Sequence, residues 1–392
     1  MKILQVVCGS GWGGGSVVVM SICRALVERG DEVWVLCSDD ENAAGFGSVG
    51  ARIVRAPLWT RSIQPLDVIP LAHIYRLCRR ERFDLVATHT SKGGVLGRLA
   101  ARAAGVPHVV YHAHAYFFNH LSPGPAKSLY VAIERFAARF GDLTLAVSEE
   151  HRRGALECGV EAPGRIRTVL NGVDLQRFAG VDGRPVRAEL GFAPDDVLIG
   201  GVGRLQVFKG YEYLIRALPP VLADFPRAQL ILCGTGPLES RLRSECERAR
   251  IADRVRFLGF RKDIPQLMAA LDVFVQPSLR EGLSIALIEA AAAGLPSVAC
   301  TIAGNAEIVQ HGRTGILVPP ADPVALGAAI RSLIEDPEGA REMGREARRR
   351  AEALFSVERM VAQHLAAYDS LMTPKERSHA LGADSKLMPG AS

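Results

Sequence analysis

The chain has 392 residues, of which 48% are hydrophobic, and a formal net charge of +5 at pH 7. A chain of this length and apolar content can bury two ordinary cores, which excludes a disordered chain and a small disulfide scaffold. Acidic and basic residues are interleaved, so no basic stripe stands out and we expect no nucleic-acid partner.

The eight cysteines are scattered without CxxC spacing, which predicts reduced thiols and no structural zinc. The apolar run at 3–8 is too short to cross a membrane, and the run at 283–300 is interrupted by Glu289 and Pro296. We therefore expect a cytoplasmic protein that is at most peripheral at the inner face of the cell membrane.

Short strand patterns alternate with longer helix patterns along the chain, which predicts parallel strands joined by crossover helices. The first series comprises 2–8, 16–29, 32–37, 66–80, 85–88, 94–104, 108–112, 128–140, 143–147, a helix beginning near Ser148, and 166–170. The second series comprises 197–202, 211–224, 229–233, 237–249, 255–258, 264–270, 273–276, 284–293 and 297–299. Helical spacing resumes at 323–335 and 356–371.

We predict an α/β protein with two doubly wound, Rossmann-like domains that face each other across a deep cleft, because open parallel sheets bind ligands at the carboxyl ends of their strands. The predicted boundaries are 1–178 for an acceptor-binding domain and 179–355 for a donor domain. A helix at 356–372 is expected to pack back on the N-terminal domain. Residues 373–392 are polar and aperiodic, and we interpret them as a disordered tail.

A glycine-rich loop follows the first predicted strand and opens a helix, so its N–H groups can approach an anion closely. The loop contains Gly9, Gly11, Gly14 and Gly15. The first three match G-x-G-x-x-G, which leaves a tight structural turn and a dinucleotide site as alternatives. No acidic residue closes the second predicted strand, which disfavours an NAD oxidoreductase.

Two cations flank the loop after the first strand of the second series. Arg204 and Lys209 stand five positions apart between that strand and its helix, where a guanidinium fork and a compact ammonium can face one diphosphate. Two solvated surface charges are the alternative. The position at the carboxyl end of a strand favours the diphosphate site.

Two carboxylates bracket the start of the helix predicted at 284–293. Glu281 precedes it, and Glu289 lies within its otherwise apolar pattern, where a buried carboxylate needs donors such as sugar hydroxyls. The N–H groups of Gly282, Leu283 and Ser284 can complete a phosphate site at the helix start. A capped helix with one tolerated glutamate is the alternative.

Three histidines and a lysine follow two neighbouring strands of the first series. His89 and Lys92 follow one strand, and His112 and His114 end the next, so their polar groups are predicted to share one rim and to bind an acceptor or take part in catalysis. A lone histidine is more often structural. Strand alternation also allows His112 to point away from the others.

The pairing of G-R-L-x3-K-G at 203–210 with E-G-L-S-x-A-L-I-E-A at 281–290 resembles glycosyltransferase family 4, whose members are retaining enzymes of the GT-B fold. Further matches are Asn171 to Asp174, Gly259-Phe260, Gly304 to Glu307 and Gly312 to Gly315. The resemblance implies transfer of a sugar from a nucleotide-sugar donor, a UDP-sugar or a GDP-sugar, without a separate cofactor.

The resemblance also implies a role for each matching residue. Arg204 and Lys209 would hold the donor diphosphate, Glu289 the ribose, and Glu281 the transferred sugar. The loop at Phe260 would lie beside the base, and Gly14 and Gly15 would approach the donor and acceptor. His114 matches the active-site histidine of the family. The implied catalytic residues are His114, Glu281, Arg204 and Lys209.

The stretches 92–102 and 133–135 are similar to a subgroup that builds bacterial exopolysaccharides and capsules on lipid carriers. This implies cell-surface polysaccharide synthesis (exopolysaccharide, capsule or lipopolysaccharide) with a lipid-linked saccharide acceptor. His114-Ala115 replaces the usual His-Gly, which leaves the acceptor open. A transferase that acts on a soluble metabolite and a nucleotide-sugar epimerase remain as alternatives.

The chain has no D-x-D motif, and the basic pair can neutralise a leaving diphosphate, so we predict catalysis without a metal. The helix predicted at 66–80 and the residues after it carry Arg76, Arg79, Arg80 and Arg82. These arginines could touch an anionic membrane, and a solvated helix face is the equal alternative.

Overall fold

The computed structural model describes residues 1–7, 11–59 and 64–372. Gly9 of the glycine-rich loop and the predicted tail at 373–392 lie outside these ranges. The chain divides into two compact units, one made of Met1–Val169 together with the segment from Arg359 onward, and the other of Leu170–Glu358. The sequence-based boundary was placed at 178/179.

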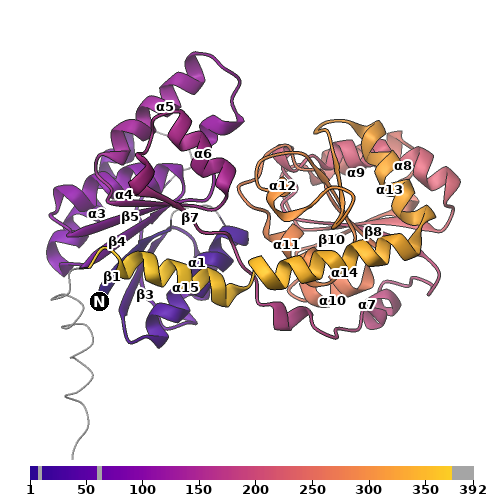
Figure 1. Cartoon of the computed structure of the whole chain (residues 1–392), viewed down its shortest axis with the longest axis horizontal. Coiled ribbons are helices and arrows are strands. Elements are labelled where there is room, and N and C mark those ends of the chain that lie inside the picture. The colour runs from indigo at the N-terminus through magenta and orange to yellow at the C-terminus, as the bar shows by residue number, and fades with distance from the viewer. Residues whose placement is uncertain (8–10, 60–63, 373–392) are drawn as a thin grey trace, which may run out of the picture. The chain divides into compact units, whose positions relative to one another are not determined.

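The first unit is built on a seven-stranded parallel sheet with the order β3-β2-β1-β4-β5-β6-β7 and helices on both faces (Figure 1). Its strands are β1 (Lys2–Val6), β2 (Glu32–Cys37), β3 (Arg52–Arg55), β4 (Leu85–His89), β5 (His108–Ala113), β6 (Leu143–Ala146) and β7 (Ile166–Thr168). Its helices are α1 (Gly14–Glu28), α2 (Asp40–Gly47), α3 (Val68–Glu81), α4 (Ser91–Ala103), α5 (Pro125–Ala138), α6 (Glu149–Glu157) and α15 (Val357–Asp369). The strand order reverses between β1 and β4, which is where open sheets of this kind bind ligands.

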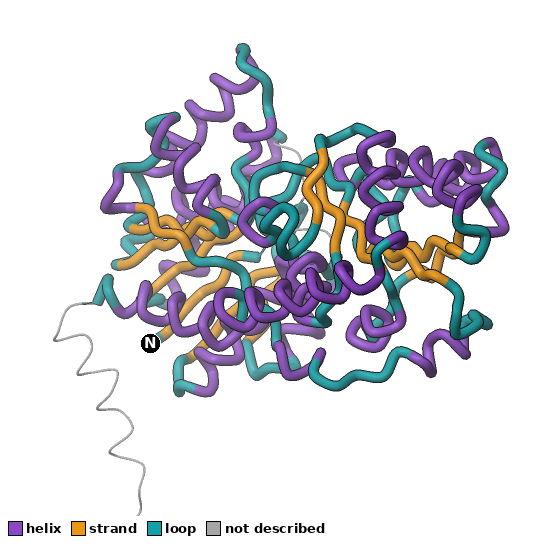
Figure 2. The backbone as a smooth tube through the Cα atoms, turned by 45° about the vertical axis from the view of Figure 1, so that its right-hand side comes forward, coloured by secondary structure: helices purple, strands orange, loops and turns teal. Residues whose placement is uncertain are grey.

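The second unit has a six-stranded parallel sheet with the order β10-β9-β8-β11-β12-β13, also enclosed by helices (Figure 2). Its strands are β8 (Val197–Val202), β9 (Ala228–Cys233), β10 (Val255–Gly259), β11 (Val273–Gln276), β12 (Ser297–Cys300) and β13 (Ile316–Val318). Its helices are α7 (Arg184–Glu189), α8 (Tyr211–Asp224), α9 (Glu239–Arg248), α10 (Ile264–Ala270), α11 (Ile285–Ala292), α12 (Asn305–Ile308), α13 (Pro323–Glu335) and α14 (Pro337–Leu354). Here the order reverses between β8 and β11.

Short 3-10 turns connect several of these elements. They span Pro65–Asp67, Phe117–His120, Pro163–Arg165, Leu175–Phe178, Val207–Lys209 and Ala252–Arg254. The turn at Val207–Lys209 matters most for function, because it lies between β8 and α8 and carries one of the two predicted cations.

The predicted fold class is confirmed, since both units are doubly wound parallel sheets. Strongly patterned elements have the predicted bounds: β8, α8 and β11 begin and end where periodicity placed them. The sequence pattern did not predict α2, β3 and β13, nor the short helices α7 and α12, nor α14. The first three are short, and α14 buries alanine and glycine rather than large apolar side chains, so its hydrophobic signal is weak.

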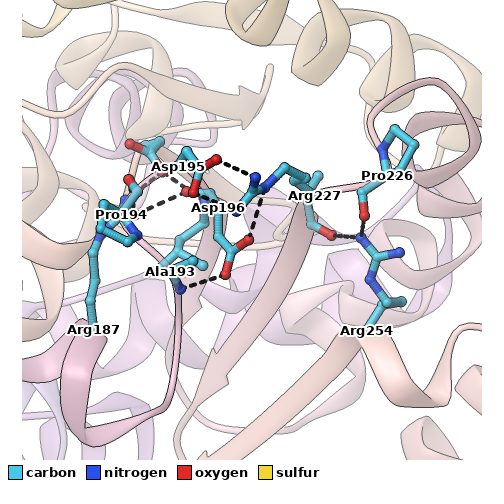
Figure 3. Close-up of polar contacts among 11 residues, drawn as sticks. Arg187, Ala193, Pro194, Asp195, Asp196, Pro226, Arg227 and Arg254 are labelled. Carbon is cyan, nitrogen blue, oxygen red and sulfur yellow. Dashed lines mark hydrogen bonds and ion pairs between the residues drawn. The ribbon is translucent and has the colours of Figure 1, made fainter.

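The amino ends of the strands in the second sheet are held by a dense polar network (Figure 3). The Asp196 carboxylate accepts from the Ala193 N–H at 2.8 Å and from Arg227 Nε at 3.4 Å. Arg187 donates to the Asp196 carbonyl at 2.9 Å and to the Ala270 carbonyl at 2.9 Å. Its other terminal nitrogen lies 2.6 Å from Asp272 Oδ2, which also accepts from the Leu198 N–H. Charged groups at this edge therefore find their partners within the protein.

Helix α15 belongs to the first unit from Arg359 onward. Its Tyr368 is completely buried there, and Asp369 pairs with Arg29 of the segment that follows α1, at 2.9 Å. Within the described residues, no helix is both long and apolar enough to span a bilayer.

Candidate functional site

The loops that follow β8 and β11 approach each other backbone to backbone in the second unit. Gly210 has φ +69°, and a Cβ added there would lie 2.0 Å from the Pro277 carbonyl oxygen. The Leu279 N–H donates to the Phe208 carbonyl at 2.7 Å. Only glycine allows this approach without strain, so the glycine of the K-G pair brings the two loops together.

Lys209 and Glu281 form an ion pair at this junction, with Nζ 2.5 Å from Oε1. The same oxygen accepts hydrogen bonds from Gln276 Nε2 and Ser278 Oγ, each at 2.8 Å. Within the described residues no donor reaches the second carboxylate oxygen of Glu281. The carboxylate is thus held firmly through one oxygen, and the other remains available to a ligand.

Sequence reasoning missed Gln276 and Ser278. Gln276 ends β11 and is 1% exposed, and Ser278 is completely buried two residues later. A polar residue that ends a buried apolar strand was the available signal, because such a side chain lies at the edge where ligands bind. Arg204 lies two residues after the end of β8 and is half-buried. The buried Leu205 beside it anchors the loop, because its N–H donates to the Thr235 carbonyl.

Glu289 lies on α11 among apolar neighbours and is half-buried. Within the described residues its carboxylate makes no hydrogen bond and no ion pair, although Arg177 lies close enough to affect its titration. Burial raises the pKa of Glu289 to about 7, and Arg177 partly offsets this rise. An unpartnered carboxylate is costly in such a place, which makes Glu289 a candidate acceptor for hydrogen bonds from a ligand.

The start of α11 is positioned by two segments that the resemblance singled out. Asn171 Nδ2 donates to the Leu283 carbonyl at 3.0 Å in a buried contact. Gly304 has φ +79°, and a Cβ there would lie 2.0 Å from the Gly282 carbonyl oxygen. Ser284 caps the helix by accepting from the Leu287 N–H at 3.4 Å. The backbone of 282–284 is therefore fixed before any ligand binds.

Phe260 lies on the loop after β10 and is 60% exposed. Next to it, Arg261 pairs with Glu189 at 2.8 Å and with Asp263 at 2.6 Å, which stiffens the loop. A pocket of about 470 Å³ opens beside this loop, lined by Arg177, Lys262, Asp263, Pro265 and Gln266. Arg177 thus links this pocket to the surroundings of Glu289.

The start of α1 is the corresponding feature of the first unit. Gly14 and Gly15 begin the helix and are both exposed, and a Cβ added at Gly15 would meet no atom within 4 Å. No side chain caps this helix end. The aromatic ring of Trp12 packs against Phe46 and beneath Gly45, which fixes the described part of the loop. An exposed, uncapped helix start can receive an anion or a sugar hydroxyl.

The structure brings His89, His112 and His114 together, as the sequence predicts. His89 Nδ1 lies 3.0 Å from His114 Nε2, and the rings of His89 and His112 have their centroids 4.4 Å apart. His89 and His112 are buried, whereas His114 is half-buried. Sequence reasoning missed three further members of this cluster, namely Gln5, His364 and Tyr368.

Lys92 is buried at the start of α4, and its Nζ lies 2.5 Å from Asp67 Oδ1. The preceding Thr90 has φ +64°, a left-handed conformation that is strained for a branched residue. Binding of an acceptor by His89, Lys92 and His112 stays a prediction, but all three side chains already have partners within the unit.

No group of three or more potential ligands for a metal occurs among the described residues. Catalysis without a metal remains a prediction. None of the cysteines in 11–59 and 64–372 forms a disulfide.

Two family models match the chain, one described as Glycosyltransferase Family 4 over residues 12–177 and one as Glycosyl transferases group 1 over residues 196–336. The chain is 31% identical to an Escherichia coli UDP-Gal:alpha-D-GlcNAc-diphosphoundecaprenol alpha-1,3-galactosyltransferase, over 73% of this chain and 76% of that one. It is 30% identical to the alpha-maltose-1-phosphate synthase of Mycolicibacterium smegmatis, over 91% and 95%.

Among solved structures, Anabaena HepE in complex with UDP and glucose superimposes with a TM-score of 0.83 and 26% identity, covering 94% of this chain and all of that one. The residues matched by the two family models include the histidine cluster of the first unit and the loops after β8 and β11 of the second. With the two parallel sheets, the paired loops after β8 and β11, and relatives that match along most of the chain, this protein is a GT-B glycosyltransferase and belongs to glycosyltransferase family 4.

Proposed function

We propose that the second unit binds a UDP-sugar and that the protein transfers the sugar to an acceptor in the synthesis of a bacterial cell-surface polysaccharide. The unpartnered Glu289 carboxylate is the observation that carries the donor site, because ribose hydroxyls are suitable donors for it. The UDP complex of HepE and the UDP-galactose named for the E. coli relative support uridine as the base.

The roles within this site follow from charge and geometry. Arg204 and Lys209 neutralise the diphosphate, and the N–H groups of 282–284 add to this at the positive end of α11. Glu281, held through Oε1 by three donors, offers Oε2 to hydroxyls of the transferred sugar. Fixed donors of this kind stabilise the charge that grows on the leaving phosphate.

A thermal-shift series tests the donor site, using UDP, GDP, ADP and their common sugar conjugates. We expect UDP compounds to raise the Tm of the wild type but not that of Glu289→Ala or Arg204→Ala. Glu247→Ala is the matched control, because Glu247 is an exposed carboxylate on α9 of the same unit. Absence of any response in the wild type would contradict the donor site.

For the acceptor we propose a lipid-linked saccharide, reached from the membrane surface through α3 and the segment before it. Exposed apolar side chains lie here beside exposed cations. Leu66 is 57% exposed, Val68 62% and Tyr75 40%, and Arg76, Arg79 and Arg80 are exposed on the same helix. Apolar side chains together with several arginines favour binding to an anionic bilayer.

Sedimentation with anionic and neutral vesicles tests this surface. We expect binding to anionic vesicles, lost when Arg76, Arg79 and Arg80 are all replaced by Gln. The control replaces Arg345, Arg348 and Arg349 of α14 in the same way, which changes the net charge equally. Binding that survives the first triple variant, or turnover of soluble sugar phosphates without lipid, would favour the soluble acceptor suggested by the alpha-maltose-1-phosphate synthase relative.

A further inference from the structure

A continuous hydrogen-bonded chain runs through the interior of the first unit and ends at His114. His114 Nε2 lies 3.0 Å from His89 Nδ1, and His89 Nε2 lies 2.8 Å from Gln5 Oε1. The amide of Gln5 donates to the Tyr368 hydroxyl at 3.5 Å, and that hydroxyl lies 2.8 Å from His112 Nε2. The members come from β1, β4, β5, α15 and the residue after β5.

All residues of this hydrogen-bonded series except His114 are buried away from solvent. Gln5 and Tyr368 are completely buried, His89 is 1% exposed and His112 2% exposed, and the ring of His364 stacks on His112 with centroids 5.0 Å apart. His114 alone keeps partial exposure. The hydrogen-bonded series therefore connects one partly exposed imidazole to groups that are buried inside the unit.

The imidazoles of the cluster are neutral near pH 7. Burial, with the neighbouring histidines, holds the pKa of His89 and His112 well below the ordinary value and lowers the pKa of His114 to about 4. A neutral imidazole has one N–H donor and one nitrogen with a lone pair, so the hydrogen bond at one nitrogen decides what the other can do.

With Oε1 of the Gln5 amide facing His89 and its Nε2 facing Tyr368, proton counting along the hydrogen-bonded series fixes the tautomer of each ring. The Gln5 amide oxygen can only accept, so His89 carries its proton on Nε2 and presents a lone pair at Nδ1. His114 must donate to that lone pair, so its own proton is on Nε2. The Tyr368 hydroxyl accepts from the Gln5 amide and donates to His112 Nε2, so every bond in the chain points the same way.

We propose that Gln5, oriented by Tyr368, acts through His89 as a positioning residue that holds His114 in its Nε2–H tautomer. The Nδ1 atom of His114 is then a bare acceptor, suited to a hydroxyl of a sugar and unsuited to a phosphate or a carbonyl. This last step rests on the proposed function, in which His114 contacts substrate.

The arrangement makes His114 an orienting group rather than a strong base. A ring with so low a pKa accepts a hydrogen bond from a hydroxyl through Nδ1 but does not hold a second proton there at neutral pH. Helix α15 thereby takes part in the site through Tyr368, although it lies more than 200 residues along the chain from His114. A fixed acceptor also selects a hydroxyl that is free to donate.

Imidazole nitrogen NMR tests the proposal on the full-length protein without substrate. Two-bond 1H–15N correlation spectra of histidine-labelled wild type report which nitrogen of each ring carries the proton, and His114→Asn assigns the His114 signals. We expect His114 and His89 both in the Nε2–H form. The Nδ1–H form of His114 would mean that the Gln5 amide faces the opposite way, and it would overturn the proposal.

Two matched variants test the part played by the distant hydroxyl. Tyr368→Phe keeps the ring but removes the hydroxyl that orients Gln5, and we expect a second set of His114 signals from the Nδ1–H form. Tyr116→Phe makes the same change at another buried tyrosine of this unit, whose hydroxyl has no partner among the described residues. It should leave His114 unchanged, and an equal response of the two variants, or none in Tyr368→Phe, would overturn the proposal.

The tautomer is read without nucleotide, so this result is independent of the donor-site test. If His114 has the expected tautomer but UDP does not change the Tm, the proposal for the hydrogen-bonded series is supported and the proposed function is contradicted. A UDP response with the Nδ1–H form of His114 would do the reverse.

Discussion

In the second sheet, charged groups near the amino ends of the strands (the amino edge) and near the carboxyl ends (the carboxyl edge) differ in whether they have partners within the protein. At the amino ends of the strands, Arg187, Asp196 and Asp272 are bonded to one another or to the backbone, so the network is complete (Figure 3). At the carboxyl ends, Glu289 has no partner among the described residues, and Glu281 is held through a single oxygen.

The difference teaches where to look for function in a fold with many charges. In a network whose members are all partnered, hydrogen bonds and ion pairs offset the free-energy cost of burying the charges, and the network stabilises the fold. For an unpartnered carboxylate on a well-packed helix, that free-energy cost is not offset until a ligand donates hydrogen bonds to it. Such a carboxylate is therefore a candidate binding residue. Changes at the two edges should therefore separate activity from stability.

The largest effect is expected from Lys209→Ala at the carboxyl edge. Loss of one fixed cation beside the diphosphate should lower kcat by about 100-fold to 1000-fold, or roughly 3 to 4 kcal/mol. Steady-state kinetics with a UDP-sugar donor measures this. A decrease below about threefold would show that Lys209 does not contact the leaving group.

Glu289→Gln should show how much the unpartnered carboxylate lowers the free energy of unfolding. Since the folded pKa of about 7 exceeds the ordinary 4.5, the folded protein holds this proton more tightly than the unfolded chain does. Stability from this group is therefore present below pH 4.5 and is lost as pH rises through 7, by about 2 to 3 kcal/mol.

Urea unfolding of both proteins at pH 5 and pH 8 checks the sign of this effect. We expect the Gln variant to exceed the wild type in stability at pH 8, with a smaller gap at pH 5, and to lose stabilisation by UDP. A gap that widens toward low pH would contradict the assignment.

At the amino edge, Arg187→Ala should act on stability alone. It removes the arginine donor from the carbonyls of Ala270 and Asp196 and leaves the Asp272 carboxylate with the Leu198 N–H, which costs about 2 kcal/mol. Thermal unfolding should show a lower Tm, while kcat per folded molecule stays the same. A fall in kcat without a fall in Tm would contradict the prediction that residues at the amino edge affect stability and not activity.

The smallest effect is expected for a pair at neither edge. Arg243 and Glu239 form an exposed i,i+4 ion pair on α9, with nitrogen and oxygen 2.8 Å apart. Such pairs contribute about 0.5 kcal/mol or less, so Arg243→Gln should leave both Tm and kcat nearly unchanged. A change as large as that of Arg187→Ala would mean that location on the sheet does not decide the outcome.

The sequence by itself determined the elements with a strong repeat and the residues that follow strands. Strands β8 and β11 and helix α8 could be placed from periodicity, because long apolar patterns with period 2 or 3.6 have few other solutions. Arg204, Lys209 and Glu281 could be singled out because polar residues after buried strands lie at the binding edge of a parallel sheet. Glu289 could be singled out as a carboxylate within an otherwise apolar helix pattern.

Only the tertiary structure decided which side chains meet across long distances in the chain. Gln5 lies in the first strand and Tyr368 in the last described helix, and neither stands out in its own local pattern. Gln276 stands out as the polar end of a buried strand, but its bond to Glu281, like that of Ser278, depends on the path of one loop. Local sequence sets backbone preferences, but the partner of a buried polar group is chosen by packing, which brings together residues that no local pattern connects.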